Sequence, residues 1–169
     1  MTTATTTAAT ISEFTVTDFD LGTNLTAKDT MEFSITALKG LTTVTELSDT
    51  SNNNSGNGDG TVVQLSADGA TVANADLVVL QNTYATEAAV LTGLSTAGGD
   101  TITYGASLDD NDAYLVAYTD GTNSYIAVAT TGAGDLATSQ GVDSVENIMV
   151  LAGVTDLSTL DSTDFSVIT

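Results

Sequence analysis

Side chains that carry oxygen gather at three places along the sequence, and each place has the composition of a cation site. The densest group has three carboxylates within four residues and a further Asp eight residues later: Asp109, Asp110, Asn111, Asp112 and Asp120. Calcium takes about six to eight oxygen ligands from carboxylates, Asn carbonyls, the backbone and water. Carboxylates this close repel one another unless solvent or a cation screens them. We therefore predict a Ca²⁺ site in this segment, and a solvated turn is the alternative interpretation.

The second group has the spacing of a calcium-binding loop without the full pattern. Its members occupy loop positions 1, 3, 7 and 12: Asp18, Asp20, Asn24 and Asp29. An EF-hand requires Gly at position 6 and a bidentate Glu at position 12. Here Gly22 is displaced and the twelfth residue is Asp, so we reject an EF-hand and predict a looser calcium loop. A third group is mostly neutral and is interpreted as a flexible polar loop: Asn52, Asn54, Asn57 and Asp59.

Catalytic residue types are scarce in this chain. It has no His, no Cys and no Arg, and its cationic side chains are Lys28 and Lys39. The usual general base, the thiol nucleophile and the ligands of transition metals are therefore missing. A pair of carboxylates can hydrolyse glycosides, but with 22 acidic residues such pairs arise by chance. We expect no enzyme, and an acid-pair hydrolase ranks third among the candidate functions.

The charge of the chain excludes several classes of partner. The net charge is −20, and two Lys cannot neutralise nucleic-acid phosphates or an anionic membrane. The same charge opposes compaction, so cations must screen it. No apolar run reaches the length of a membrane span, which argues against membrane insertion. The N-terminus lacks the basic and apolar regions of a signal peptide. The protein is therefore expected in the cytosol or exported without a cleaved N-terminal signal.

A β-hairpin is the clearest structural feature of the sequence. Residues 113–119 and 124–130 are rich in Tyr, Val and Ile, and Asp120-Gly121 lies between them. Such residues suit strands, and Asp-Gly is a frequent turn dipeptide. The period of two places Tyr114, Val116 and Tyr118 on one face, with Tyr125 and Ala127 across from them.

Other segments favour strands as well. Alternating or apolar patterns predict strands at residues 11–19, 31–38, 41–47, 61–65, 75–80 and 165–168. The run 75–80 is apolar throughout, which is typical of a strand buried on both faces. Residues 83–94 favour one helix, capped by Asn82 or Thr83, and residues 48–60 form a polar loop. Residues 145–151 fit helix or strand. We predict a mostly-β single domain over residues 11–169, a β-sandwich or β-roll-like fold with one short helix.

Three segments together resemble the C-terminal block of RTX (repeats-in-toxin) proteins, which leave bacteria by type I secretion. They are TVTDFDLGTNLTAKDTMEF within residues 11–33, GGDTITYGASLDDNDAYLVAY at 98–118 and DSVENIMVLAGVTDLSTLDSTDFSVIT at 143–169. The resemblance implies an uncleaved C-terminal export signal, recognition by the type I secretion machinery, an extracellular location and dependence on calcium. The calcium-binding nonapeptide array of that family is absent from this chain, so its calcium-filled β-roll is not expected here.

The N-terminal residues suggest how the protein associates. Residues 1–10 consist of Thr and Ala after Met1 and carry no charged side chain. We interpret them as an extended tail that adds a strand to the next copy, through Thr2, Thr3, Thr5, Thr6, Thr7 and Thr10; a frayed terminus is the alternative. The expected function is a secreted, calcium-stabilised structural protein that forms a filament, surface layer or matrix. The rival is an extracellular adhesin that grips glycans through Tyr and Asp side chains.

Overall fold

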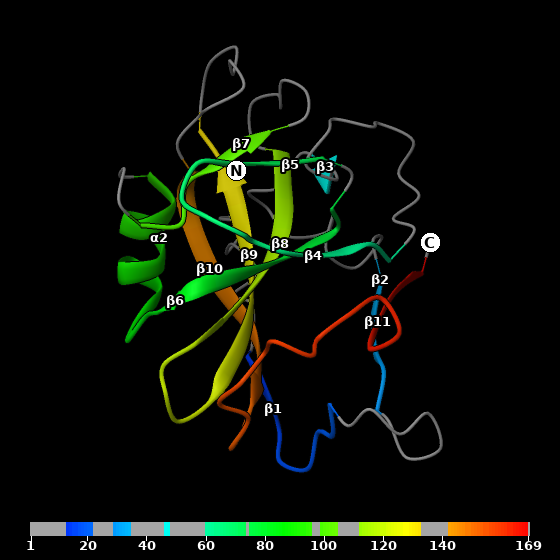
Figure 1. Cartoon of the computed structure of the whole chain (residues 1–169). Coiled ribbons are helices and arrows are strands. Elements are labelled where there is room, and N and C mark those ends of the chain that lie inside the picture. Colours follow the sequence, from blue (N-terminus) through cyan, green and yellow to red (C-terminus); the bar gives the residue numbers. More distant parts are fainter. Residues whose placement is uncertain are drawn as a thin grey trace, which may run out of the picture.

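The computed structural model describes residues 13–21, 29–34, 46–47, 60–73, 75–95, 99–104, 112–132 and 142–168 (Figure 1). The described elements are β1 (Phe14–Val16), β2 (Met31–Ser34), β3 (Glu46–Leu47), β4 (Val62–Gln64), β5 (Ala70–Val72), β6 (Leu77–Thr83), α2 (Glu87–Ser95), β7 (Ile102–Tyr104), β8 (Asp112–Thr119), β9 (Ser124–Thr131), β10 (Val142–Leu151) and β11 (Phe165–Ile168). Over the residues that the structure describes, the mostly-β fold with one short helix is confirmed.

A seven-stranded mixed sheet, which we call the main sheet, organises these elements. Its strand order is β1-β10-β9-β8-β6-β4, and β3 pairs with β8 off this path. The hairpin β8–β9 at its centre is antiparallel, as predicted, with Tyr118 opposite Tyr125 and Val116 opposite Ala127. Gly121 in the connecting turn has φ +88°, a conformation that Gly adopts without steric cost. The strands that flank the hairpin reach it by long connections.

Strand β6 lies inside the main sheet, and its first four residues, 77–80, are buried on both faces. It pairs in parallel with β4 on one side and β8 on the other. Leu77 and Val79 contribute to a core on one face, and Val78 and Leu80 to a core on the opposite face. This is why the sequence shows a continuous apolar run at this strand rather than alternation.

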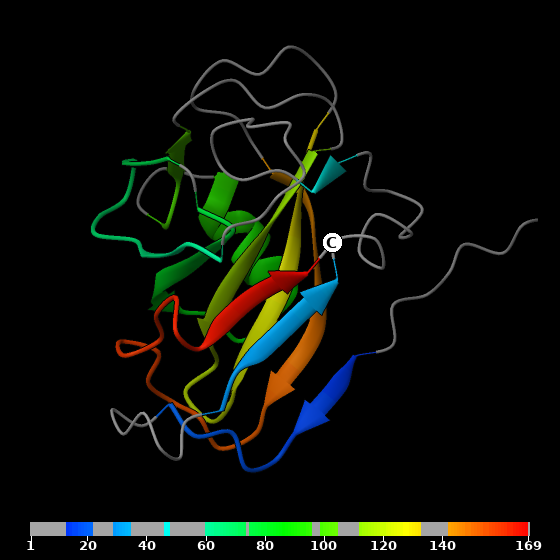
Figure 2. The same ribbon diagram turned by 90° about the vertical axis from the view of Figure 1, so that its right-hand side faces the viewer.

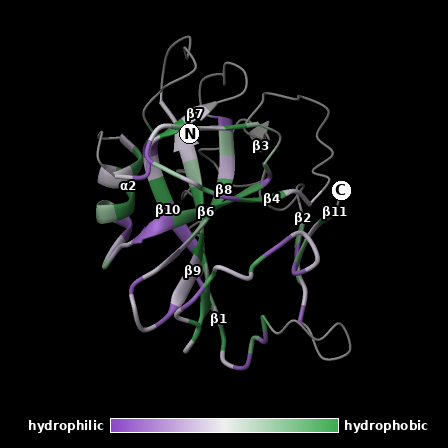
Figure 3. Ribbon diagram, viewed as in Figure 1, coloured by the Kyte–Doolittle hydropathy of each residue, from purple (hydrophilic) through white to green (hydrophobic). Residues whose placement is uncertain are grey.

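Two layers cover the main sheet. Helix α2 and the parallel pair β5–β7 bury one core, the helix-side core, which includes Val90, Leu94 and Ile102. The parallel pair β2–β11 lies across the opposite face (Figure 2) and buries a second core, the pair-side core. Phe33 of β2 and Phe165 of β11 meet there, with ring centroids 5.6 Å apart. In Figure 3 the hydrophobic residues follow β9 and β10 between these layers.

The pair β2–β11 extends from one edge of the main sheet toward the other. On the β4 side, Gln64 Nε2 donates to the carbonyl oxygens of Leu157 and Leu160, both at 2.9 Å. Gly60, just before β4, packs so closely that an added Cβ would lie 3.1 Å from Phe165 O. The β4 edge is therefore covered by the chain that leads into β11. Strand β2 is left to face β1, at the other edge of the main sheet.

The structure corrects three expectations from the sequence and decides one open alternative. The helix begins at Glu87 rather than residue 83, because β6 continues to Thr83. Its cap is Thr86, whose hydroxyl accepts from Ala89 N at 3.2 Å, and not Asn82 or Thr83. Residues 145–151, which fit helix or strand, belong to the ten-residue strand β10. Strand β1 is three residues long, shorter than the predicted 11–19.

Candidate functional site

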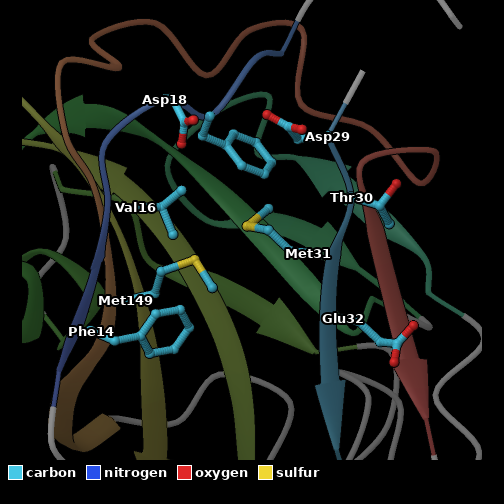
Figure 4. A pocket seen from close by; sticks show the side chains of 9 residues that line it. Phe14, Val16, Asp18, Asp29, Thr30, Met31, Glu32 and Met149 are labelled. Atoms are coloured by element: carbon cyan, nitrogen blue, oxygen red, sulfur yellow. The ribbon is translucent and has the colours of Figure 1, made fainter. Parts of the chain in front are cut away.

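A groove between β1 and β2 is the best-formed candidate site among the described residues. Its cavity has a volume of about 360 Å³. Apolar side chains from β1, β2, β10 and the segment after β1 form its floor, and carboxylates and a hydroxyl surround them: Phe14, Val16, Phe19, Met31, Met149, Asp18, Asp29, Thr30 and Glu32. Figure 4 shows Phe14, Val16 and Met149 on one side of the groove and Met31 on the other. Phe14 is 50% exposed and is the one large hydrophobic residue exposed to this extent in the described part of the chain.

Strand β1 turns one row of backbone groups toward solvent beside this groove. It pairs in parallel with β10, and Val16 O accepts from Ala152 N at 2.8 Å on that side. In a parallel ladder alternate residues bond to the same neighbour. The N–H and C=O of Thr15 therefore point away from β10. Within the described residues β10 is the partner strand of β1, so this outer edge carries no strand.

Strand β2 presents a second edge that faces the first. It pairs in parallel with β11, and Met31 N donates to Asp164 O at 2.7 Å on that side. By the same alternation, the N–H and C=O of Glu32 point away from β11, toward the groove. The Glu32 side chain lies on the exposed face of β2, whereas Met31 and Phe33 are buried.

The groove is closed at one end by the described residues that follow β1 and precede β2, 17–21 and 29–30. Asp29 N donates to Asp20 O at 3.3 Å, and Asp20 N donates to Asp29 Oδ2 at 2.9 Å. Figure 4 shows Asp18 and Asp29 at this end, above the apolar side chains. Two members of the second predicted calcium group, Asp18 and Asp29, therefore line the groove, Asp20 contacts Asp29 through its backbone, and Asn24 lies outside the described residues. The carboxylate of Asp29, a predicted metal ligand, accepts a hydrogen bond from the backbone of the loop and so has a structural role.

The first predicted calcium group is not brought together by the described residues. Asp112 is the first residue of β8 and is 1% exposed, and Asp120 follows its last residue. An eight-residue strand separates them by roughly 25 Å. One ion cannot bind both carboxylates, so Asp120 does not belong to this group. Asp109, Asp110 and Asn111 lie outside the described residues.

Asp120 has a structural partner set of its own in the hairpin turn. Its Oδ1 accepts from Thr122 N and Asn123 N, both at 2.7 Å, and its Oδ2 accepts from Tyr125 Oη at 2.8 Å. The bond from Asn123 N is the largest of the causes that lower the pKa of Asp120, followed by that from Tyr125. The ionised carboxylate therefore holds the turn, an Asx-turn arrangement.

The described residues contain no group of three or more acidic side chains close enough to hold a metal ion. They provide carboxylates in ones and twos, and several of these accept from backbone N–H groups, among them Asp29, Asp120 and Asp156. Calcium sites built from residues 105–111 or 22–28 fall outside the described ranges. The predicted tail residues 1–10 are also outside them.

The tyrosines lie where a glycan cannot reach most of them. Tyr84, Tyr114 and Tyr118 are buried in the helix-side core. Tyr118 stacks on Tyr125, with ring centroids 5.0 Å apart, and Tyr84 meets Tyr118 edge-on at 6.4 Å. Burial raises the pKa of Tyr118 to about 12. These rings stabilise the fold, so three of the five tyrosines are not available to grip a glycan, as the adhesin hypothesis would require.

A buried polar network around Asp100 has no counterpart among the sequence predictions. Asp100 is 0% exposed and accepts from Tyr84 Oη and Asn82 N, both at 2.9 Å, and from Asn82 Nδ2 at 3.1 Å. Burial, followed by the bond to Asp100, raises the pKa of Tyr84. The network joins the end of β6 to the chain that follows α2. Its signal in the sequence is one Asp after Gly98-Gly99, too little to reveal a partner eighteen residues away.

A second, more polar cavity of about 310 Å³ lies beside β6 and the chain between β10 and β11. Its lining includes Gln64, Gln81, Thr83, Asp156 and Ser158. The amide nitrogen of Gln64 is already engaged by two carbonyls, and the Asp156 carboxylate accepts from Ser158 N at 2.8 Å. These polar groups are used by the fold, so this cavity is a weaker candidate than the groove.

Comparison with known proteins provides no relative. No protein family, no curated protein and no solved structure matches the chain. Across the described residues, no helix has the length and apolar character needed to cross a membrane.

Proposed function

We propose that this is a secreted, extracellular structural protein that assembles with copies of itself and is stabilised by calcium. The observation that carries the proposal is the groove, where two strand edges face one another across an apolar floor. Strand edges with unpaired N–H and C=O groups are templates for association with another chain. An exposed Phe14 beside such an edge adds apolar surface that association would bury.

The charge of the chain explains why calcium belongs to the proposal. Copies that each carry −20 repel one another, and two Lys per chain cannot offset this repulsion. Divalent cations bound to carboxylates reduce the net charge at every contact. Extracellular calcium modules bind with dissociation constants of about 10⁻⁴–10⁻³ M, which suits weak surface sites made of few carboxylates. The resemblance to the RTX block agrees with an extracellular location of this kind.

The oligomeric state of the purified full chain tests this function. Light scattering after size exclusion and negative-stain microscopy are recorded in millimolar CaCl₂, in chelator, and in NaCl of matched ionic strength. We expect assemblies in calcium and smaller species in chelator. Equal assembly in NaCl would show that charge screening, rather than specific binding of calcium, permits assembly. A monomer under all three conditions would refute the structural function.

Export is tested in cells rather than by truncation. Removing the C-terminal segment would delete Leu157, Leu160 and Phe165 from the pair-side core, so loss of export would not distinguish a lost signal from a lost fold. The intact chain is instead expressed in bacteria with and without a type I exporter. We expect it in the medium when the exporter is present. Retention in both strains, with normal synthesis, would contradict the proposed route.

A further inference from the structure

The groove has the geometry of a missing strand. Strands β1 and β2 run in opposite directions along its two sides (Figure 4). The backbone groups of Thr15 point out from one side, and those of Glu32 point in from the other. One extended segment between them would bond to both edges, parallel to one strand and antiparallel to the other. Such mixed pairing already exists in the main sheet, where β8 has one parallel and one antiparallel neighbour within the principal strand order.

We propose that residues 2–10 of a second copy occupy this groove and join the pair β2–β11 to the main sheet. This inference rests on the proposed self-assembly and names its acceptor. The acidic groups Asp18, Asp29 and Glu32 line the groove and disfavour an acidic segment. Thr2 to Ser12 is uncharged in its side chains, so it enters without repulsion.

The side chains of this segment also fit the floor. Alternate positions of a strand face the same side, and positions 2, 4, 6, 8 and 10 read Thr-Ala-Thr-Ala-Thr. Small and β-branched side chains let a strand lie close to the side chains of Val16, Met31 and Met149. The Thr positions have high strand preference, which lowers the cost of an extended conformation.

The same sequence argues for a second copy rather than the groove of the same chain. To lie beside its own β1, the tail would have to reverse direction within a few residues of Phe14. Residues 8–13 read AATISE, in which Ser12 is the one residue of a type frequent in turns and no Gly, Asn, Asp or Pro occurs. An extended segment of twelve residues reaches roughly 40 Å, enough to enter a neighbouring molecule. Each copy then donates one strand and accepts one, which propagates as a filament.

The absence of Cys allows a clean cross-linking test. Three variants of the full chain each carry a single Cys in the tail: Thr5→Cys, Thr6→Cys and Thr7→Cys. A fourth variant, the partner in each mixture, carries Glu32→Cys beside the groove. Each mixture is prepared in calcium and oxidised. Facing residues on neighbouring strands have the spacing that disulfides require. The control partner carries Ala67→Cys, an exposed position next to β5 on the opposite side of the main sheet.

We expect a disulfide-linked dimer with Glu32→Cys at one or two adjacent tail positions and at least about tenfold less with Ala67→Cys. Equal cross-linking at both sites would overturn the proposal. A double variant with both Cys in one chain, oxidised at high dilution, detects entry of the tail into its own groove. A predominantly intramolecular disulfide in that sample would also overturn it.

A second pair of variants tests the edge itself. Thr15→Pro removes an N–H that points away from β10 and leaves the N–H groups of its neighbours in place, so β1 should still pair with β10. Thr15→Ala keeps the N–H and is the matched control. Loss of one hydrogen bond and obstruction by the ring should raise the concentration for half-assembly about tenfold in Thr15→Pro alone.

The outcomes separate this inference from the function on which it rests. If the unmodified chain never assembles, both the function and the inference fail. If it assembles, but Thr15→Pro assembles like Thr15→Ala and Ala67→Cys cross-links to the tail as well as Glu32→Cys does, self-assembly stands and the acceptor groove is wrong. Circular dichroism verifies that Thr15→Pro is folded. If it is not, Glu32→Pro and its control Glu32→Ala apply the same test from β2.

Discussion

Replacing Phe14 with Ala should separate the stability of the single molecule from its assembly. Phe14 lies on the edge strand β1 beside the groove and is 50% exposed. Phe165 is 2% exposed in the pair-side core and provides the comparison. The two substitutions remove the same atoms from sites that differ in burial.

The magnitudes follow from these exposures. Full burial of a Phe side chain contributes about 1.5–3 kcal/mol, so the buried half of Phe14 contributes about 1 kcal/mol to the fold. Phe165→Ala also leaves a cavity and should cost about 3–5 kcal/mol. If assembly covers the exposed half of Phe14, its loss weakens association by about 1 kcal/mol, or about fivefold.

Two measurements test this separation. Urea unfolding in chelator, at concentrations where the chain is monomeric, gives the free energy of unfolding of each variant. Sedimentation velocity in calcium gives the concentration for half-assembly, and Phe14→Leu serves as the apolar control. A destabilisation by Phe14→Ala as large as that by Phe165→Ala would show that β1 is not an exposed edge. Unchanged assembly would remove Phe14 from the interface.

Three further predictions concern the polar groups that stabilise the fold. Asp100→Ala should lower the free energy of unfolding by about 2–4 kcal/mol, because it deprives Tyr84 and Asn82 of their acceptor, and Tyr84→Phe should lower it by about 1 kcal/mol. Additive effects of the two substitutions in a double-mutant cycle, measured by thermal unfolding, would contradict a shared network. The pKa of Tyr118 is raised to about 12, whereas an unfolded Tyr titrates near pH 10. The contribution of the protonated Tyr118 to the stability of the fold is therefore complete below about pH 10 and is lost as the pH rises toward about 12. Tyr118→Phe should flatten this alkaline limb in circular dichroism, and an identical limb would refute the assignment. The lowered pKa of Asp120 contributes stability above the carboxyl's ordinary pKa of about 3.9 that is lost as the pH falls through the folded value; Asp120→Asn should flatten the acid limb, and an unchanged acid limb would exclude this source.

Local signals in the sequence were sufficient for the hairpin and for the buried first part of β6, residues 77–80. Asp120-Gly121 defines a turn by its own chemistry, and the strands beside it alternate or are apolar as their burial requires. Both features depend on residues close in the chain. The same holds for β11, whose predicted range 165–168 matches the structure.

The groove could not be predicted because its walls come from distant parts of the chain. Phe14 pairs with Met149 and Met31 pairs with Phe165, contacts between residues more than 130 positions apart. Nothing in a single sequence specifies which edges of two sheets will face one another. The helix start was missed for a related reason: propensity favours a helix from residue 83, but pairing with β8 keeps Thr83 in β6.

The acidic residues illustrate how the same side chains support two interpretations. Asp76 accepts from Gly60 N and Thr61 N, Asp68 from Thr101 N, and Glu87 from Asn147 N. In a chain with no Pro, every residue after the first has a backbone amide N–H, so the carboxylates find partners without cationic side chains.

This arrangement has a consequence for assembly. An N–H donor favours the ionised carboxylate, as the lowered pKa values of Asp120 and Asp156 indicate. Folding therefore satisfies the hydrogen-bonding needs of Asp120 and Asp156 without removing their charge. The repulsion between copies persists after folding, and the strand edges of β1 and β2 can associate only when cations offset it. Calcium should accordingly act more strongly on association than on the stability of the single molecule.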